Sequence, residues 1–316
     1  MTARRLIVNA DDFGLPAGVD RGIARAVAAG AVTSVSVLAN LADPAAVAAL
    51  ARAHPALSFA AHLNLTTGRP LRPASEVPSL VGASGEFLPL ATLTRRALAG
   101  RVRREDAARE LAAQVARLVE HGLRVDHLDS HEHVHLLPGV TAAVIDVARR
   151  TGVGRLRCHR PRLFSAGGRR RRRLVAYYRA HPRRIASHAL KRALAARFAR
   201  AGLSGPDGVV SPALLVEPAT GGPLREWEAV VRHLPPGTWE LVVHPADLEV
   251  PRDADDTARL GELVERRGAE LAALEAPAFH ALLAAHGATL VSFAAVPPGR
   301  GRRLVAAARA GEAHAG

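Results

Sequence analysis

The sequence predicts an α/β fold, and within that class an irregular (β/α) barrel. Short runs rich in Val, Ile and Leu alternate along the chain with Ala- and Arg-rich stretches of helical periodicity. This alternation is typical of parallel strands joined by crossover helices. About eight strand segments in a chain of 316 residues favour a barrel over an open sheet. Because the repeats differ in length, we expect the barrel to be irregular.

Periodicity and capping residues assign the elements in chain order. The expected strands span residues 5–9, 33–39, 57–64, 124–129, 155–158, 209–216, 239–244 and 289–293. The expected helices span residues 18–29, 44–52, 104–121, 139–150 and 257–275. Asp43 is a suitable N-cap ahead of Pro44, Gly30 and Gly122 are suitable helix ends, and Gly268 is a weak point within its helix. A long loop rich in Pro and Gly, residues 66–89, separates the third strand from the third helix.

We expect a single domain over residues 1–296, with a helical insertion at about 169–200 and a frayed tail at 297–316. The insertion departs from the strand–helix rhythm because it begins with a run of five arginines at 169–173. Tyr177, Tyr178 and further arginines follow in a helical stretch. Two interpretations remain open: a face that is solvated or contacts another subunit, or a site for an anionic substrate group.

The composition argues against nucleic acid as the ligand, although the net charge is +14 at pH 7. Lys191 is the only lysine among 43 basic residues, and alanine is abundant throughout. This combination is typical of GC-rich codon usage, which replaces lysine by arginine along a whole chain. Aromatic residues make up 3% of the chain, which leaves few side chains to stack on bases. We therefore expect no nucleic-acid partner.

The sequence also predicts a cytoplasmic protein without a membrane span. No uninterrupted apolar stretch reaches the roughly 18 residues that a transmembrane helix needs. The apolar run Leu6–Val8 follows two arginines, as in a signal peptide, but the run ends at Asn9 and is too short for the apolar region of a signal peptide. The single cysteine, Cys158, cannot form an internal disulfide and is expected to be a small buried residue.

Candidate catalytic and metal-binding residues stand where four separate expected strands end. Strand ends converge on one face of an α/β barrel, so these side chains are expected to build one site. They are Asp11, Asp12, His62, Asp129, His131, His133, His135 and His244. No Ser nucleophile elbow, P-loop or dinucleotide glycine motif is present in the sequence.

Asp11 and Asp12 are adjacent carboxylates, which repel each other unless a cation is near. They are either a capping pair before the next helix, or a metal ligand and a free base whose side chains point in different directions. His62, beside Asn64 in an apolar strand, is either a buried core residue or part of the site. His244, which follows an apolar run, is likewise either a buried core residue or part of the site.

The segment His131–His135 carries three histidines at alternate positions. On an extended chain all three would lie on one face. A histidine-rich extended segment behind Asp129 is typical of a metal site, and histidines that do not ligate would bind substrate or orient the ligands. The alternative is a loop whose histidines cap nearby backbone groups.

The motifs together resemble those of a known family. The segment Leu6–Gly14, LIVNADDFG, resembles the opening of the YdjC-like carbohydrate deacetylases, the family of chitooligosaccharide deacetylase. Three further segments resemble motifs of the same family: HLNLT at 62–66, HLDSHEHVH at 127–135 and the pair His244-Pro245. The order and spacing match from about residue 4 to residue 295.

The resemblance implies a barrel of the polysaccharide-deacetylase type and one divalent metal ion, Mg²⁺ or Zn²⁺. It also implies removal of N-acetyl groups from small, chitooligosaccharide-like amino sugars, and it favours a homodimer. Carried over by position, the metal ligands would be Asp12, His62 and His131. Asp11 would be the catalytic base and His244 the catalytic acid. The residues expected to bind substrate are Asn64, His133 and Arg157.

Several alternatives stay open at this point. A related branch of the family acts in hopanoid lipid biosynthesis and has Asn-Ala-His where this chain has Asp129-Ser130-His131, which places this chain closer to the sugar branch. Deacetylation of a glycosylated, hopanoid-type lipid precursor is therefore the alternative reaction. A non-catalytic protein that binds a metal or a sugar is the alternative class. Two histidines and a carboxylate also describe non-haem Fe(II) oxygenases, but those usually have β-rich folds.

Overall fold

The computed structural model of the protein describes residues 3–157, 160, 170–210, 220–250 and 264–299. The chain divides into two compact units. The first unit comprises residues 1–35, 158–196 and 206–295, and the second comprises residues 36–157, 197–205 and 296–316. Each unit therefore combines segments that lie far apart in the sequence.

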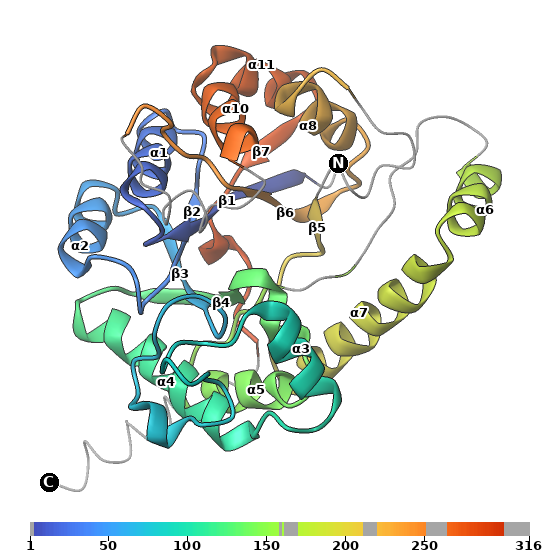
Figure 1. The fold of residues 1–316 in the computed structure, drawn as a ribbon. Coiled ribbons are helices and arrows are strands. Elements are labelled where there is room, and N and C mark those ends of the chain that lie inside the picture. Colours follow the sequence, from blue (N-terminus) through green and yellow to red (C-terminus); the bar gives the residue numbers. More distant parts are fainter. Residues whose placement is uncertain (1–2, 158–159, 161–169, 211–219, 251–263, 300–316) are drawn as a thin grey trace, which may run out of the picture. The chain divides into compact units, whose positions relative to one another are not determined.

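The first unit is built around its long first strand (Figure 1). Its described strands are β1 (Arg4–Phe13), β5 (Gly208–Val210), β6 (Gly237–Val243) and β7 (Ala288–Leu290). Its described helices are α1 (Ala17–Ala28), α6 (Arg170–Ala180), α8 (Pro223–Val231), α10 (Val264–Glu275), α11 (Pro277–Ala285) and most of α7 (Pro182–Arg200), with a 3₁₀ turn at Phe293–Ala295. β6 and β7 run parallel to β1, and β5 runs parallel to β6.

Apolar side chains from strands and helices form the core of this first unit. Leu6, Ile7 and Val8 of β1 are fully buried at consecutive positions. A strand that is buried on both faces is expected in a parallel sheet whose faces are covered by helices. Trp227 of α8 packs edge-on against Phe279 of α11 at 5.7 Å, which joins two of those covering helices.

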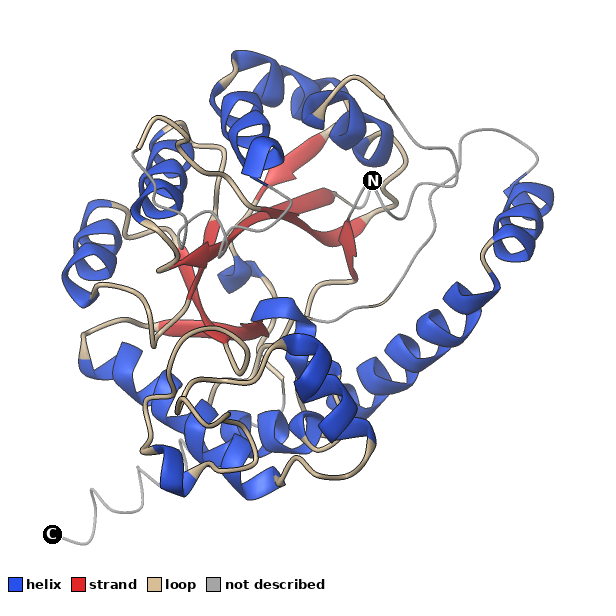
Figure 2. Cartoon of the chain, in the orientation of Figure 1, coloured by secondary structure: helices blue, strands red, loops and turns tan. Residues whose placement is uncertain are grey.

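The second unit contains the strands β3 (Ser58–Leu63) and β4 (Val125–Ser130), which are parallel. Its helices are α2 (Pro44–Ala53), α3 (Leu90–Leu98), α4 (Arg104–Glu120) and α5 (Val140–Thr151), with 3₁₀ segments at Ala74–Glu76 and His131–Leu136. α4 and α5 pack against each other (Figure 2). Asp43 caps α2 as expected, because its side chain accepts a hydrogen bond from Ala45 N at 2.9 Å.

The strand β2 (Ser34–Val37) belongs in part to each unit. The hydrogen-bonded order of the described strands is β4-β3-β2-β1-β6-β5, with β7 also paired to β1. A parallel sheet with surrounding helices confirms the predicted irregular (β/α) fold. The expected single domain over residues 1–296 stays a prediction.

Most expected elements are present with shifted ends. β1 continues to Phe13, so Asp11 and Asp12 lie within its last residues and not after the strand. α10 passes through Gly268 without a break, and a Cβ at that position would lie 2.6 Å from the Leu248 side chain. The glycine therefore allows close packing of the helix.

Three short helices, α3, α8 and α11, were not expected from the sequence. α8 and α11 each begin with a proline, which is favourable at the first position of a helix but gives little periodicity over nine residues. Some expected features lie outside the described residues: Cys158, residues 211–216, residues 257–263 and most of the tail. Within the described part of the chain, every helix is too short or too polar to cross a lipid bilayer.

Candidate functional site

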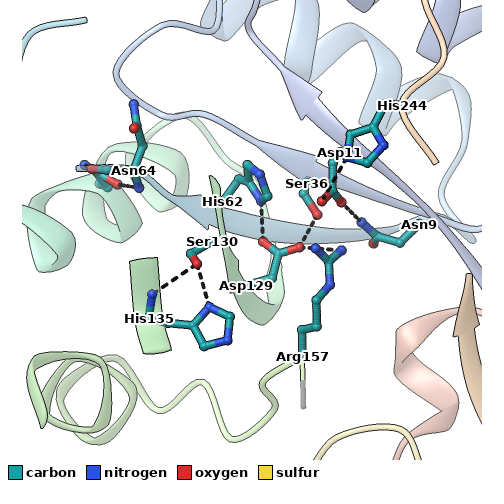
Figure 3. A network of polar contacts seen from close by, with 11 residues as sticks. Asn9, Asp11, Ser36, His62, Asn64, Asp129, Ser130, His135, Arg157 and His244 are labelled. Atoms are coloured by element: carbon teal, nitrogen blue, oxygen red, sulfur yellow. Dashed lines mark hydrogen bonds and ion pairs between the residues drawn. The ribbon is translucent and has the colours of Figure 1, made fainter. Parts of the chain in front are cut away.

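Asp11 is buried near the end of β1 and lies between an amide and an imidazole (Figure 3). Asn9 Nδ2 donates a hydrogen bond to Asp11 Oδ1 at 2.7 Å. His244 follows the end of β6, and its Nε2 lies 4.0 Å from Asp11 Oδ2. The side chain of His244 is 33% exposed. One carboxylate at the strand ends therefore faces a histidine that solvent can reach.

The neighbouring carboxylate of Asp12 has a different partner. Arg267 of α10 donates a hydrogen bond from Nη2 to Asp12 Oδ2 at 2.6 Å, and both side chains are buried. Asp12 has φ of +79°, a backbone conformation that residues other than glycine rarely adopt. The two adjacent carboxylates therefore have different partners, and the expected division of their roles stays a prediction.

α10 holds two residues of this part of the site. One turn after Arg267, Glu270 accepts a hydrogen bond from the backbone N–H of His244 at 2.6 Å. Arg266 donates to the other oxygen of Glu270 at 3.0 Å. The helix therefore contacts Asp12 through a guanidinium and positions the backbone of His244 through a carboxylate.

Two glycines of α1 allow the segment after β6 to approach closely. A Cβ on Gly22 would lie 2.6 Å from Ala246 Cα, and a Cβ on Gly18 would lie 2.7 Å from the backbone oxygen of Asp247. The backbone N–H of Asp247 donates to Gly18 O at 2.7 Å. The buried Asp247 carboxylate is paired with Arg25 on the same helix at 3.0 Å. These contacts hold the chain that carries His244.

In the second unit, Asp129 at the end of β4 is the centre of a buried polar cluster (Figure 3). Its Oδ1 lies 2.8 Å from Nδ1 of His62. Its Oδ2 accepts from Ser36 Oγ at 2.5 Å and pairs with Nη2 of Arg157 at 2.8 Å. Burial alone would raise the pKa of the Asp129 carboxyl, but Arg157 and His62 lower the pKa well below its usual range. Asp129 is therefore an ionised carboxylate with a partner on each oxygen.

This cluster orients His62, which stands next to the end of β3. Because Nδ1 of His62 is engaged by Asp129, Nε2 is the nitrogen that would bind a metal ion. A carboxylate behind a ligating histidine is the usual arrangement in metal sites. The ring of His131 lies edge-on to the ring of His62, with 5.6 Å between their centroids.

The expectation of an extended segment at His131–His135 is wrong. The chain turns immediately after β4, and Glu132 and His133 have positive φ values of 50° and 58°. The hydroxyl of Ser130 accepts a hydrogen bond from His135 N at 3.2 Å, which closes the turn. The three histidines therefore do not share a face: His131 is half-buried, His133 is exposed and His135 is buried.

His135 is a structural partner in this turn. Its Nδ1 lies 2.5 Å from Ser130 Oγ. Burial lowers the pKa of His135 well below its ordinary value, and the nearby His133 and Arg157 lower it further. The ring is therefore neutral at neutral pH. The backbone oxygen of His135 accepts a hydrogen bond from the Thr141 hydroxyl at 2.9 Å.

Asn64, just after β3, is buried and shapes the following loop. Its Oδ1 accepts from the backbone N–H groups of Thr66 and Thr67, and its Nδ2 donates to Asn40 Oδ1 and to Thr67 O. Gln114 of α4 bonds both the N–H and the C=O of the Asn64 backbone, at 2.9 Å and 2.7 Å. The loop after His62 is thus tied to the helix at its first residue.

Glu110, one turn before Gln114 on α4, extends this connection. The carboxylate is fully buried and accepts from the backbone N–H groups of Leu71 and Arg72 and from Gln114 Nε2. A buried carboxylate held by backbone donors fixes the loop at 71–72 as well. Two residues of α4 therefore define the path of the chain from residue 64 to residue 72.

The structure describes all eight of the predicted site residues. Asp11, Asp12 and His244 lie in the first unit, and the others lie in the second. Of the three expected substrate-binding residues, His133 is exposed, whereas Asn64 and Arg157 are fully buried.

Sequence reasoning missed five residues that support the site. They are Ser36, Glu110, Gln114, Arg267 and Glu270. The signal that could have revealed two of them is a row of polar residues, Asp106, Glu110 and Gln114, spaced four apart beside the apolar positions of the helix.

Among the described residues, the first unit offers the carboxylates of Asp11 and Asp12 as donors for a metal ion, and the second unit offers His62, His131 and Asp129. Asp129 already has partners on both of its oxygens and is therefore the least suited of these residues. One carboxylate and two imidazoles would suit a divalent ion and leave coordination positions for other ligands.

The protein is of the α/β class, with a parallel sheet whose strand ends carry carboxylate and imidazole side chains. The model of the YdjC-like protein family matches residues 5–285, and the chain therefore belongs to the YdjC-like family. This confirms the resemblance that the sequence motifs indicate.

Individual relatives agree with this assignment. A carbohydrate deacetylase from Geobacillus stearothermophilus is 46% identical over 149 residues, which cover 46% of this chain and 57% of that protein. A chitooligosaccharide deacetylase from Klebsiella pneumoniae is 40% identical over 153 residues, which cover 48% of this chain and 58% of that protein. The match thus spans somewhat more than half of these curated relatives.

A solved structure shows the same fold. It is a protein from Enterococcus faecalis V583 that is named for cellobiose-phosphate cleavage. Its TM-score to this chain is 0.66, over 93% of this chain and 99% of that chain, at 22% sequence identity.

Replacing Asp129 by Asn is expected to destabilise the protein by about 3–5 kcal/mol, because it removes the buried carboxylate that pairs with Arg157 and with His62. Urea unfolding measures the difference. Asp126→Asn in the same strand is the control, because its partner Arg124 is exposed; its cost should be below about 1 kcal/mol. Equal stability of Asp129→Asn and the wild type would contradict the central role of this ion pair.

Replacing Gln114 by Leu is expected to loosen the loop after His62. The change removes the partners of the Asn64 N–H and C=O and one of the three donors to Glu110, which should cost about 2–4 kcal/mol. Hydrogen exchange at the backbone amides of residues 64–72 should become faster. Glu105→Gln, on the exposed side of the same helix, serves as the control. Unchanged exchange in the Gln114→Leu variant would show that α4 does not hold this loop.

Proposed function

We propose that this protein is a metal-dependent hydrolase that removes N-acetyl groups from small acetylated sugars of the chitooligosaccharide type. The single observation that carries the proposal is the pair of Asp11 and His244, a buried carboxylate and a partly exposed imidazole, in a family whose curated relatives are named carbohydrate and chitooligosaccharide deacetylases. Amide hydrolysis needs a base for the attacking water and an acid for the leaving amine. These two side chains offer both.

We assign the metal ligands to Asp12, His62 and His131, which together offer one carboxylate and two imidazoles. The donor set fits a divalent ion, either Mg²⁺ or Zn²⁺. The hydrogen bond between Asp129 and Nδ1 of His62 supports the assignment, because it leaves Nε2 as the coordinating atom. Such an ion would supply Lewis-acid polarisation of the acetamido carbonyl and lower the pKa of water.

Asp11 acts as the general base in this proposal. Asn9 orients the carboxylate through Oδ1, and Oδ2, the oxygen nearer to His244, takes the proton from the attacking water. The water oxygen adds to the acetyl carbonyl carbon, and the C–N bond then breaks. The neighbouring Asp12 is less suited to this role, because its Oδ2 is occupied by the hydrogen bond from Arg267.

His244 acts as the general acid. Its exposed edge can reach the substrate nitrogen, and Glu270 fixes its backbone. In the protonated form it delivers a proton to the departing amine, so the products are acetate and the free amino sugar. Of the expected substrate-binding residues, His133 is the one whose exposed side chain contacts the sugar. Asn64 and Arg157 act indirectly, by shaping the loop and by holding Asp129.

The first test is acetate release from diacetylchitobiose, from its 6-phosphate and from simple N-acetylated sugars. We expect release after chelator treatment only when Mg²⁺, Zn²⁺, Mn²⁺ or Co²⁺ is returned, and a loss of at least about 100-fold in His131→Ala. Isothermal titration with the metal alone separates loss of the ion from loss of chemistry. Bound metal without release from any of these sugars would contradict the sugar substrate and leave an acetylated lipid precursor, or mere metal and sugar binding, as the alternatives.

The second test separates the two proposed proton-transfer roles. Asp11→Asn is expected to retain metal binding and to lose about 10²- to 10⁴-fold in kcat on both an N-acetyl sugar and 4-nitrophenyl acetate. His244→Ala should lose a similar factor on the sugar but little on 4-nitrophenyl acetate, whose leaving group departs without a proton. Equal losses of His244→Ala on both substrates would contradict its role as the acid.

A further inference from the structure

Nearly all of the net charge of this chain lies in one pair of helices. Residues 170–200, which form α6 and α7, contain eleven arginine and lysine residues and no acidic residue. They account for eleven of the fourteen net positive charges, and the rest of the chain is almost balanced. A codon bias would spread the excess evenly along the sequence. This concentration is therefore a property of the segment, which we name the cationic arm (Figure 1).

Exposed aliphatic side chains lie among these basic residues. Five large hydrophobic residues are exposed in the described part of the chain, and three of them are on the cationic arm: Val175, Ile185 and Leu190, at 53–56% exposure. Each of the three shares a helix face with an exposed arginine three, four or seven positions away. The pairs are Arg172 with Val175, Val175 with Arg179, Arg183 with Leu190, and Ile185 with Arg192.

The bend between α6 and α7 is held by its own aromatic side chains. Tyr177 is buried and stacks on His181 at 4.7 Å, and Arg184 lies over the Tyr177 ring at 5.5 Å. The hydroxyl of Tyr178 is 3.0 Å from Nδ1 of the buried His188. Both tyrosines of the arm are thus engaged in the bend, which presents arginines and aliphatic residues at the surface.

We infer that the cationic arm docks onto the surface of an anionic phospholipid bilayer. Guanidinium groups bind phosphate oxygens in a bidentate manner, and each basic side chain near an anionic bilayer strengthens binding about fivefold. The aliphatic side chains between them enter the boundary between headgroups and acyl chains. The inference does not depend on the proposed deacetylase reaction.

Other partners fit this surface less well. The phosphate backbone of a nucleic acid has no apolar surface that Val175, Ile185 and Leu190 could contact. The tyrosines that could stack on bases are packed in the bend. A second copy of the chain in a two-fold contact through the arm would bring like charges together.

The test is sedimentation of the full chain with lipid vesicles. Vesicles of phosphatidylcholine with roughly one third phosphatidylglycerol are compared with vesicles of phosphatidylcholine alone at low and high salt. Binding is expected only to the anionic vesicles and should weaken as the salt concentration rises. Equal binding to both vesicles, or no binding to either at low salt, would overturn the inference.

Matched variants locate the contact. Replacing four exposed arginines of the arm by Gln should weaken vesicle binding by about 100-fold or more; these are Arg172, Arg179, Arg183 and Arg192. The same change at four exposed arginines elsewhere should alter binding far less; these are Arg52, Arg95, Arg101 and Arg149. Equal losses in the two sets would mean that the net charge of the chain, and not the arm, drives binding.

A second pair of variants tests the aliphatic contribution. Val175→Ser with Ile185→Ser and Leu190→Ser should reduce binding about tenfold, whereas Leu98→Ser with Val119→Ser, the other two exposed hydrophobic residues, should not. Circular dichroism confirms that each variant is folded. If the serine variant binds vesicles normally, or if duplex DNA binds through the same arginines more tightly than the vesicles do, the lipid assignment is wrong. If the chain instead forms a salt-sensitive dimer through the exposed arginines of the cationic arm, the arm is a self-association surface and the lipid assignment is also wrong.

Discussion

A buried carboxylate that has lost its water must be held by cations and hydrogen-bond donors, and the strand ends of this protein are organised around that requirement. Asp129 is the clearest case, because Arg157, His62 and Ser36 occupy both of its oxygens in a fully buried setting. Removing water from such a group is expensive, and the cost is recovered only if every lone pair finds a partner. The same partners that stabilise the carboxylate also fix the ring of His62. Stability and the geometry of a candidate metal ligand are therefore one property of this cluster.

The same constraint separates the roles of Asp11 and Asp12. Two adjacent carboxylates in one environment would repel each other and share their protons. Here Asp12 is neutralised by Arg267, whereas Asp11 has an amide donor on one oxygen and a histidine near the other. Adjacent side chains of a strand point in different directions, so the two carboxylates can have separate partners. These different partners support the proposed roles of Asp12 as a metal ligand and of Asp11 as a base.

Helices on the outside of the sheet position the strand ends. α10 contacts Asp12 through Arg267 and the backbone of His244 through Glu270, and α4 holds the loop after His62 through Gln114 and Glu110. In both helices the two polar residues are one turn apart on the buried face. A polar residue in that position would destabilise an ordinary amphipathic helix, and it is tolerated because each one bonds a defined group of the site.

The sequence by itself determined the alternation of parallel strands and helices, the capped start of α2 at Asp43, and the placement of Asp11, His62, Asp129 and His244 at strand ends. These features depend on local periodicity and on nearest neighbours, which a single sequence displays.

Only the tertiary structure decided which partner each of those side chains has. Arg267 is 255 positions from Asp12, and Arg157 follows Asp129 by 28 positions, so no spacing rule could pair them. The turn at His131–His135 also escaped prediction, because alternate histidines suit an extended chain equally well and the Ser130 hydroxyl selects the turn. Buried charges select their partners through long-range packing, and that is why the sequence suggests candidate site residues but not the contacts that each of them makes.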